Sequence, residues 1–294
     1  MHVLDEPAVQ QRLHYQDLIP AIADALAALS SGKVVQPVRS VLPVAPHHGF
    51  FAVMPAYAGA LGAKLVTFYP KNVGMHTHHA LIVMFRPETG EPVAVMDGRL
   101  ITEMRTAAAS AVATERLARA DASVLAILGS GVQAKSHLAA LRHVRSFKEV
   151  RVWSPRNAAA FAERHGVKAP ATATDAVRGA DVVVVAVNAT TPVLQGRWLA
   201  PGTHVNAIGA TRPDWRELDD DLVKTARVFV DSREAALRES GDVIASRRGS
   251  EVTEIGAVVS GSDPGRRNAE EITLFKSVGV AIEDVAAAAL VLRA

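Results

Sequence analysis

Cysteine is absent from the 294-residue sequence, which excludes disulfide bonds, zinc–thiolate sites and cysteine nucleophiles. No run of eighteen or more apolar residues occurs, so the sequence indicates no membrane span. The first ten residues, MHVLDEPAVQ, are acidic and lack the apolar region of a secretion signal. We therefore expect a cytoplasmic protein.

Blocks of like charge, internal repeats and low-complexity segments are also absent. The formal net charge is only +2, so we expect neither a nucleic-acid partner nor a membrane partner. Hydrophobic residues make up 49% of the chain and charged residues 21%, which is typical of a globular protein with a sizeable core. The length favours two domains over one.

The pattern of apolar residues changes along the chain. The first third holds short strand-like pieces such as KLVTFYP (64–70), ALIVMFRP (80–87) and PVAVMDG (92–98), followed by an alanine-rich helical stretch over 99–119. From 122 to about 260, apolar strands alternate with helices. This alternation predicts an α/β fold with a doubly wound parallel sheet covered on both faces.

The alternating region is expected to form a dinucleotide-binding domain of the Rossmann type over residues 118–272. Residues 1–117 together with 273–294 are expected to form a smaller α+β domain for substrate binding and dimerisation. The last segment, ITLFKSVGVAIEDVAAAALVLRA, reads as one long apolar helix that packs back on the first domain.

A glycine-rich turn stands between a predicted strand, SVLAIL, and a predicted helix. Gly129, Gly131 and Ala134 match the pattern G-x-G-x-x-G/A. The first glycine permits a tight turn, the second lets the backbone approach a pyrophosphate, and the third position needs a small residue for helix–strand packing. The start of the helix offers free N–H groups to that anion. This turn predicts a dinucleotide site.

The end of the second strand bears on the choice of nucleotide. NAD sites place an acidic residue there to bind the ribose hydroxyls, but this strand ends in Ser154, Pro155, Arg156 and Asn157. A nearby arginine can pair with the 2′-phosphate of NADP, which a carboxylate would repel. The sequence therefore favours NADP(H), with NAD(H) as the alternative.

Three cations in the first third lie in apolar surroundings: Arg39, Lys64 and Arg105. Charges at such positions are rarely buried without a partner, so the three are candidates for binding a substrate carboxylate. His76, His78 and His79 invite a metal interpretation. Adjacent histidines entering a strand point to opposite faces, however, and we expect no metal site.

The chain resembles the ornithine cyclodeaminase/mu-crystallin family over nearly its whole length, most closely the ketimine reductases of that family. The run GATRPDWRELDD is highly specific. The other matching segments are QPVRSVLPV, VMPAY, KLVTFY, AVMDGRLITEMRTAA, ILGSGVQAKSH, SFKEVRVW, VDSREAALRESGDV and LFKSVGVAIED.

The resemblance implies roles for particular residues. Arg39, Lys64 and Arg105 match the residues that bind the substrate carboxylate, and Thr211 and Val278 also match substrate-facing positions. Lys64, Arg105 and Thr211 are the implied catalytic residues, with Lys64 a proton donor if burial lowers its pKa. The implied cofactor-binding residues are Thr77, His78, Arg105, Gly129, Gly131, Val132, Gln133, Ala134, Ser154, Arg156, Asn157, Val187, Asn188, Asn206, Ile208 and Ser277.

One position separates the activities of the family. Cyclodeaminases carry an aspartate where this chain has Thr211, and a hydroxyl is a poor general base at neutral pH. The resemblance therefore implies a homodimeric enzyme that uses NAD(P)H to reduce the C=N bond of a carboxylated imine, such as piperideine-2-carboxylate or pyrroline-2-carboxylate. The alternatives are an ornithine cyclodeaminase-type lyase, an alanine-type amino acid dehydrogenase, an acyclic imine reductase, and an NADP-dependent protein that binds a small ligand such as thyroid hormone.

Overall fold

A computed structural model describes residues 1–246 and 251–294. The chain divides into two compact units. Unit 1 comprises Met1–Arg105 and Val280–Ala294, and unit 2 comprises Thr106–Gly279. Within residues 1–246 and 251–294, no helix combines the length and apolar character needed to cross a membrane.

Unit 1 is built on a six-stranded sheet of order β1-β6-β5-β4-β3-β2, in which only the β1–β6 pair is parallel. Antiparallel neighbours can be joined by a very short turn, as β3 and β4 are at Gly59. The strands are β1 (His2–Leu4), β2 (Ser40–Val44), β3 (Gly49–Ala58), β4 (Ala60–Phe68), β5 (His78–Phe85) and β6 (Pro92–Asp97), and the first helix is α1 (Glu6–Gln10).

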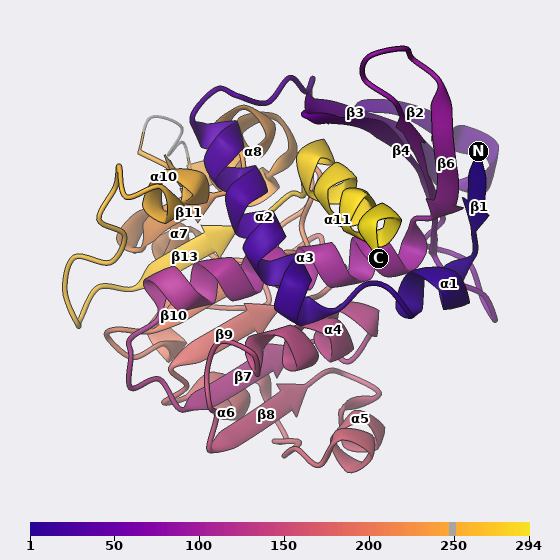
Figure 1. The fold of residues 1–294 in the computed structure, drawn as a ribbon. Coiled ribbons are helices and arrows are strands. Elements are labelled where there is room, and N and C mark those ends of the chain that lie inside the picture. The colour runs from indigo at the N-terminus through magenta and orange to yellow at the C-terminus, as the bar shows by residue number, and fades with distance from the viewer. Residues whose placement is uncertain (247–250) are drawn as a thin grey trace. The chain divides into compact units, whose positions relative to one another are not determined.

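An apolar helix covers one face of this sheet, and a second helix packs on the first. Helix α11 (Ala281–Arg293) packs on β3, β4 and β5, and α2 (Tyr15–Ser30) lies beside α11 (Figure 1). Successive side chains of a strand point to opposite faces, so the buried residues of each strand lie on one face of the sheet. Met54 of β3, Ile82 of β5 and Met96 of β6 are buried on this face. Helix α11 thus belongs to unit 1 together with the N-terminal strands.

Unit 2 contains a seven-stranded sheet of order β12-β11-β13-β10-β9-β7-β8, in which every pair is parallel. The predicted doubly wound α/β fold is therefore confirmed. The strands are β7 (Val124–Leu128), β8 (Glu149–Trp153), β9 (Val182–Val185), β10 (His204–Ala207), β11 (Arg227–Val230), β12 (Thr253–Glu254) and β13 (Thr273–Lys276).

Helices alternate with these strands and bury the apolar faces of the sheet (Figure 1). They are α4 (Val132–Leu141), α5 (Ala158–His165), α6 (Ala173–Val177), α7 (Asp220–Thr225), α8 (Arg233–Glu239), α9 (Gly241–Ser246) and α10 (Ile255–Val259). The chain passes from β7 to β8 on one side and then to β9 on the other side of β7. Ligands of such sheets bind at this reversal, beside the carboxyl ends of the strands.

The C-terminal segment is not the single helix that the sequence suggested. Residues 273–276 form β13, which is inserted between β10 and β11, and Gly279 then takes a positive φ of 78° before α11 begins. A segment as short as this, with only Leu274 and Phe275 apolar, fits a central parallel strand as well as a helix, so periodicity alone does not separate the two. Residues 273–279 consequently belong to unit 2.

The other boundary lies within helix α3 (Arg99–Leu117), at residue 105, whereas the sequence suggested residue 117. The second half of α3 is tied to unit 2 by hydrogen bonds. Asn206 donates to Thr114 Oγ1 over 2.9 Å, and His137 Nε2 lies 2.9 Å from Ser110 Oγ. A helix that serves two units in succession has no break in its sequence pattern to mark the division.

Candidate functional site

Lys64 occupies a position that the strand pattern reserves for an apolar residue. It lies on β4 between Met54 of β3 and Ile82 of β5, both of which are buried, and it shares their face of the sheet. Only 2% of Lys64 is exposed. A lysine in this position needs an anionic partner, because an unpaired charge is strongly disfavoured in an apolar interior.

Helix α11 supplies that partner within unit 1. Lys64 Nζ lies 2.7 Å from Asp284 Oδ2, and Arg105 Nε donates to Asp284 Oδ1 over 2.9 Å. Arg105 Nη1 also donates to Glu283 Oε2 over 2.6 Å. Both carboxylates are fully buried, and Arg105 is almost so. Of the cations predicted from the sequence, Lys64 thus pairs with Asp284, and Arg105 pairs with both acids.

The electrostatics of the cluster perturb Lys64. Burial, helped by the charges of Arg105 and Arg39 and opposed by Asp284, lowers the pKa of Lys64 to about 7. Burial by itself would raise the pKa of Asp284, but the charges of Arg105 and Lys64 lower it. Lys64 therefore exchanges a proton near neutral pH, while Asp284 stays ionised.

The two acids were not among the residues singled out from the sequence. Their signal was present, because Glu283 and Asp284 stand together in an otherwise apolar helix. Arg39 is half-buried directly before β2, and its charge acts on Lys64. The charge of Arg39 thus contributes to the electrostatics of the cluster formed by Lys64, Arg105, Glu283 and Asp284.

The predicted cofactor residues Thr77 and His78 also belong to unit 1. Thr77 Oγ1 lies 3.2 Å from His78 Nδ1, and the His78 ring stacks on Phe68 with centroids 4.3 Å apart. Loss of hydration and the Lys64 charge lower the pKa of His78, which is neutral at pH 7. Among the described residues, no three His, Asp or Glu side chains gather as a metal-binding group.

In unit 2, the glycine turn follows the carboxyl end of β7. Gly129 has φ +122°, and a Cβ there would lie 2.3 Å from the Ala186 carbonyl oxygen. A Cβ on Gly131 would meet nothing within 4 Å, so the backbone is open to a ligand at that point. Gly131 begins α4 without a side-chain cap, and Ala134 is fully buried.

The turn therefore fits a dinucleotide pyrophosphate. The absent side chain at Gly131 leaves space for the phosphate, and the first N–H groups of α4 supply the partial positive charge that an anion prefers. Val132 is exposed and Gln133 half-buried on the first turn of α4.

The end of β8 lies beside this turn. Ser154 Oγ is 2.8 Å from Ser130 Oγ and accepts a hydrogen bond from the Asn157 N–H over 3.2 Å. Arg156 and Asn157 are exposed. The polar residues predicted to choose the nucleotide are thus adjacent to the glycine turn, as expected for neighbouring parallel strands.

The ends of β9 and β10 carry further predicted residues on the same edge. Val187 and Asn188 follow β9, while Ile208 and Thr211 follow β10. Asn206 differs, because it lies inside β10 and is completely buried. Its amide donates to Thr114 Oγ1 over 2.9 Å, and its oxygen lies 3.3 Å from His204 Nε2. The Asn206 side chain therefore joins the core instead of the predicted cofactor site.

Ser277 and Val278 follow β13 and are held by a residue that the sequence did not single out. The buried Asp231 carboxylate accepts from Ser277 Oγ over 2.9 Å, from the Val278 N–H over 2.8 Å and from the Gly279 N–H over 2.6 Å. Asp231 stands at the end of β11, next to β13 in the sheet. Its signal was a lone acid directly after an apolar strand.

Comparison with known proteins places this geometry in context. The model of the ornithine cyclodeaminase/mu-crystallin family matches residues 1–293. Ketimine reductase mu-crystallin of Mus musculus is 48% identical over 302 residues, covering 98% of this chain and 95% of that protein.

Solved structures agree over the whole chain. The Δ(1)-pyrroline-2-carboxylate reductase of Thermococcus litoralis, in complex with NADH and L-proline, has a TM-score of 0.95 at 37% identity and is covered to 97%. An archaeal alanine dehydrogenase, a dimer with bound NAD, has a TM-score of 0.94 at 35% identity and is covered to 95%. The chain belongs to the ornithine cyclodeaminase/mu-crystallin family.

Proposed function

We propose that this protein uses NAD(P)H to reduce the C=N bond of a carboxylated imine, cyclic ketimines such as piperideine-2-carboxylate and pyrroline-2-carboxylate being the preferred class. The observation that carries the proposal is the buried cluster of Lys64, Arg105, Glu283 and Asp284, with its pKa of about 7 for Lys64. The names of the relatives, a ketimine reductase and a pyrroline-2-carboxylate reductase, support the same class.

The substrate carboxylate is assigned to Arg39, Lys64 and Arg105. The cations attract a substrate carboxylate, and the planar guanidinium of Arg105 is suited to hydrogen bonding with it. Such binding fixes the imine carbon in one orientation, and orientation alone lowers a barrier by several kcal/mol. When bound, the nicotinamide supplies the hydride.

Protonation of the imine nitrogen is assigned to Lys64. An iminium accepts hydride more readily than an imine, and an acid is most effective when its pKa lies near the working pH. The pKa of about 7 meets this condition. Thr211 is assigned a hydrogen bond to the substrate. Its hydroxyl stands where cyclodeaminases carry an aspartate, which is why a reductase is preferred to a lyase.

For the cofactor, we infer a preference for NADP(H). Its support is Arg156, which is exposed beside the glycine turn, together with the lack of an acid at residues 154–157. The two solved relatives bind NADH and NAD, so both nucleotides are compared in the test below.

A homodimer is also proposed. The face of the unit 1 sheet opposite α11 is apolar, with Phe51, Val53, Leu65 and Val83 only partly buried and Leu81 49% exposed. Exposed apolar faces of this kind mark association surfaces. The archaeal relative is a dimer. Sedimentation of the purified protein should give twice the chain mass.

The function is tested by following the nicotinamide absorbance with NADPH and with NADH, offering both cyclic imines and ornithine in turn. Rapid oxidation of NADPH by the imines is expected. Ammonia release from ornithine without net oxidation would instead make the protein a cyclodeaminase. If none of the three substrates gave nicotinamide oxidation or ammonia release, the proposal would be refuted.

Arg105→Lys provides the variant for the carboxylate site. It keeps a positive charge opposite Glu283 and Asp284 but loses the planar fork. We expect kcat/KM for the imines to fall by about a hundredfold, while NADPH affinity changes by less than about threefold. Unchanged turnover would remove Arg105 from the carboxylate site.

A further inference from the structure

A buried carboxylate in unit 2, Glu217, holds the chain where it leaves strand β10. The Gly209 N–H donates to both oxygens of Glu217, over 3.0 Å to Oε1 and 2.9 Å to Oε2. Lys276 Nζ of β13 lies 2.5 Å from Glu217 Oε1, and both side chains are completely buried. Glu217 thus connects the end of β10 with the end of the neighbouring strand β13.

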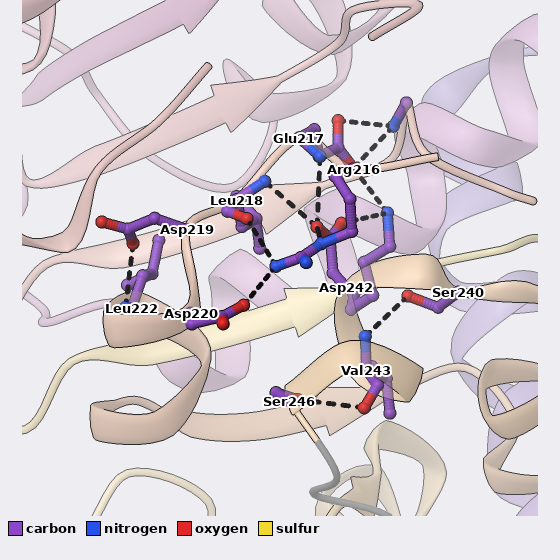
Figure 2. Close-up of polar contacts among 12 residues, drawn as sticks. Arg216, Glu217, Leu218, Asp219, Asp220, Leu222, Ser240, Asp242, Val243 and Ser246 are labelled. Atoms are coloured by element: carbon purple, nitrogen blue, oxygen red, sulfur yellow. Dashed lines mark hydrogen bonds and ion pairs between the residues drawn. The ribbon is translucent and has the colours of Figure 1, made fainter. Parts of the chain in front are cut away.

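Glu217 is itself fixed by Asp242, at the start of α9. One oxygen of Asp242 accepts from Arg216 Nε over 3.1 Å, from the Glu217 N–H over 3.1 Å and from the Leu218 N–H over 3.2 Å (Figure 2). Its other oxygen lies 3.7 Å from Lys276 Nζ. With its backbone and its carboxylate both held, Glu217 has little freedom to release Gly209.

Gly209 is confined from the opposite side as well. A Cβ at this position would lie 1.9 Å from the Val187 carbonyl oxygen and 2.6 Å from Glu217 Oε2. The backbone at residue 209 is therefore clamped between the end of β9 and the Glu217 carboxylate. Thr211 follows two residues later in the chain.

We propose that Glu217 is a positioning residue for residues 209–211, which it holds in the shape that presents Thr211 to the imine. The proposal rests on the function proposed above, in which Thr211 contacts the substrate. Glu217 does not touch the substrate and acts through the Gly209 backbone.

A stabilising role alone does not account for this arrangement. Replacing a buried ion pair with apolar side chains of similar volume is often neutral or stabilising, so a Glu–Lys pair is not needed to fill this space. An apolar side chain cannot accept hydrogen bonds from Gly209. Asp231 repeats the arrangement on the next strand end, where it holds residues 277–279 through three donors.

The experiment compares the full-length wild type with Glu217→Gln and two matched controls. Asp231→Asn removes the charge from a second buried carboxylate, which holds a different strand end. Asp219→Asn changes an acid that accepts from the N–H groups of Gly196 and Leu222, away from both strand ends. Three quantities are measured for each: amide hydrogen exchange by peptide, the NADPH dissociation constant, and kcat and KM for the imine.

For Glu217→Gln, we expect exchange within 208–213 to accelerate by about tenfold or more, because the amide keeps one acceptor oxygen, loses the charge that Lys276 pairs with and places an NH2 donor among the donors Gly209 N–H and Lys276 Nζ. The imine kcat should fall by about ten- to a hundredfold, since small displacements of positioned groups are costly to rate. The NADPH dissociation constant should change by less than about twofold. Asp231→Asn should accelerate exchange at 277–279 instead, and Asp219→Asn at neither segment.

Unchanged exchange at 208–213 in Glu217→Gln would overturn the proposal whatever the activity. Faster exchange with an unaltered kcat would overturn it too, because Thr211 would then not depend on the clamp. Should the single variant fail to fold, Glu217→Gln/Lys276→Met removes both charges together and is measured in the same way. The exchange readout needs no turnover, so a wild type inactive on imines would refute the proposed function separately.

Discussion

Lys64 offers the sharpest test of the reasoning, because its lowered pKa has a calculable effect on stability. In the unfolded chain a lysine keeps its proton up to about 10.5, whereas burial in the folded protein lowers the pKa of Lys64 to about 7. Between these values the unfolded state binds one more proton than the folded state. Burial of the protonated lysine therefore lowers the free energy of unfolding below about pH 7. This loss is recovered as the pH rises toward about 10.5.

The magnitude follows from the same two values. At about 1.4 kcal/mol for each pKa unit, the whole effect is about 5 kcal/mol, and about 3 kcal/mol of it falls between pH 7 and about pH 9.5. Lys64→Met removes the titrating group. The unfolding free energy of the wild type minus that of Lys64→Met should therefore increase by about 3 kcal/mol between pH 7 and about pH 9.5.

Urea unfolding at several pH values measures this gain directly. Lys71→Met, which changes an exposed lysine of the same unit, is the matched control and should run parallel to the wild type. A constant difference between the wild type and Lys64→Met would show that Lys64 keeps its proton in the folded protein. Its assignment as the proton donor at neutral pH would then be wrong.

Imine reduction should slow by about tenfold per pH unit above about pH 7 as Lys64 loses its proton, and Asp284→Asn should move this decline to lower pH because Asp284 raises the pKa of Lys64. A pH–rate profile that is flat from 7 to 9 would contradict this assignment. Arg156→Ala should weaken NADPH binding by at least about tenfold and leave NADH binding nearly unchanged, as titration of each nucleotide will test; equal losses would mean that Arg156 does not contact the 2′-phosphate. Gly129→Ala should unfold or strongly destabilise unit 2, since its Cβ would overlap the Ala186 carbonyl, whereas Gly131→Ala should keep its melting temperature and lose nucleotide affinity. The opposite order of stabilities would refute the reading of that turn.

Local patterns were sufficient for much of the architecture. The parallel sheet followed from short apolar strands alternating with helices, and the nucleotide turn from Gly129 and Gly131 between a strand and a helix. Both depend on residues within one turn or one strand, where steric and hydrogen-bonding preferences act directly. Residues 273–276 were misread because a short apolar run suits a buried strand or a helix equally. Only the pairing of β13 with β10 and β11 decides between them.

The site divides in the same way. By itself the sequence determined which cations stand in apolar surroundings, Lys64 and Arg105, and its family resemblance gave the expectation that Thr211 separates reductase from cyclodeaminase. Only the tertiary structure brought Asp284 to Lys64 across 220 residues of chain, and Glu217 to Gly209 and Lys276. The reason is physical. A pKa or a clamped backbone depends on burial and on charges a few ångströms away, and these neighbours are chosen by the packing of the whole unit.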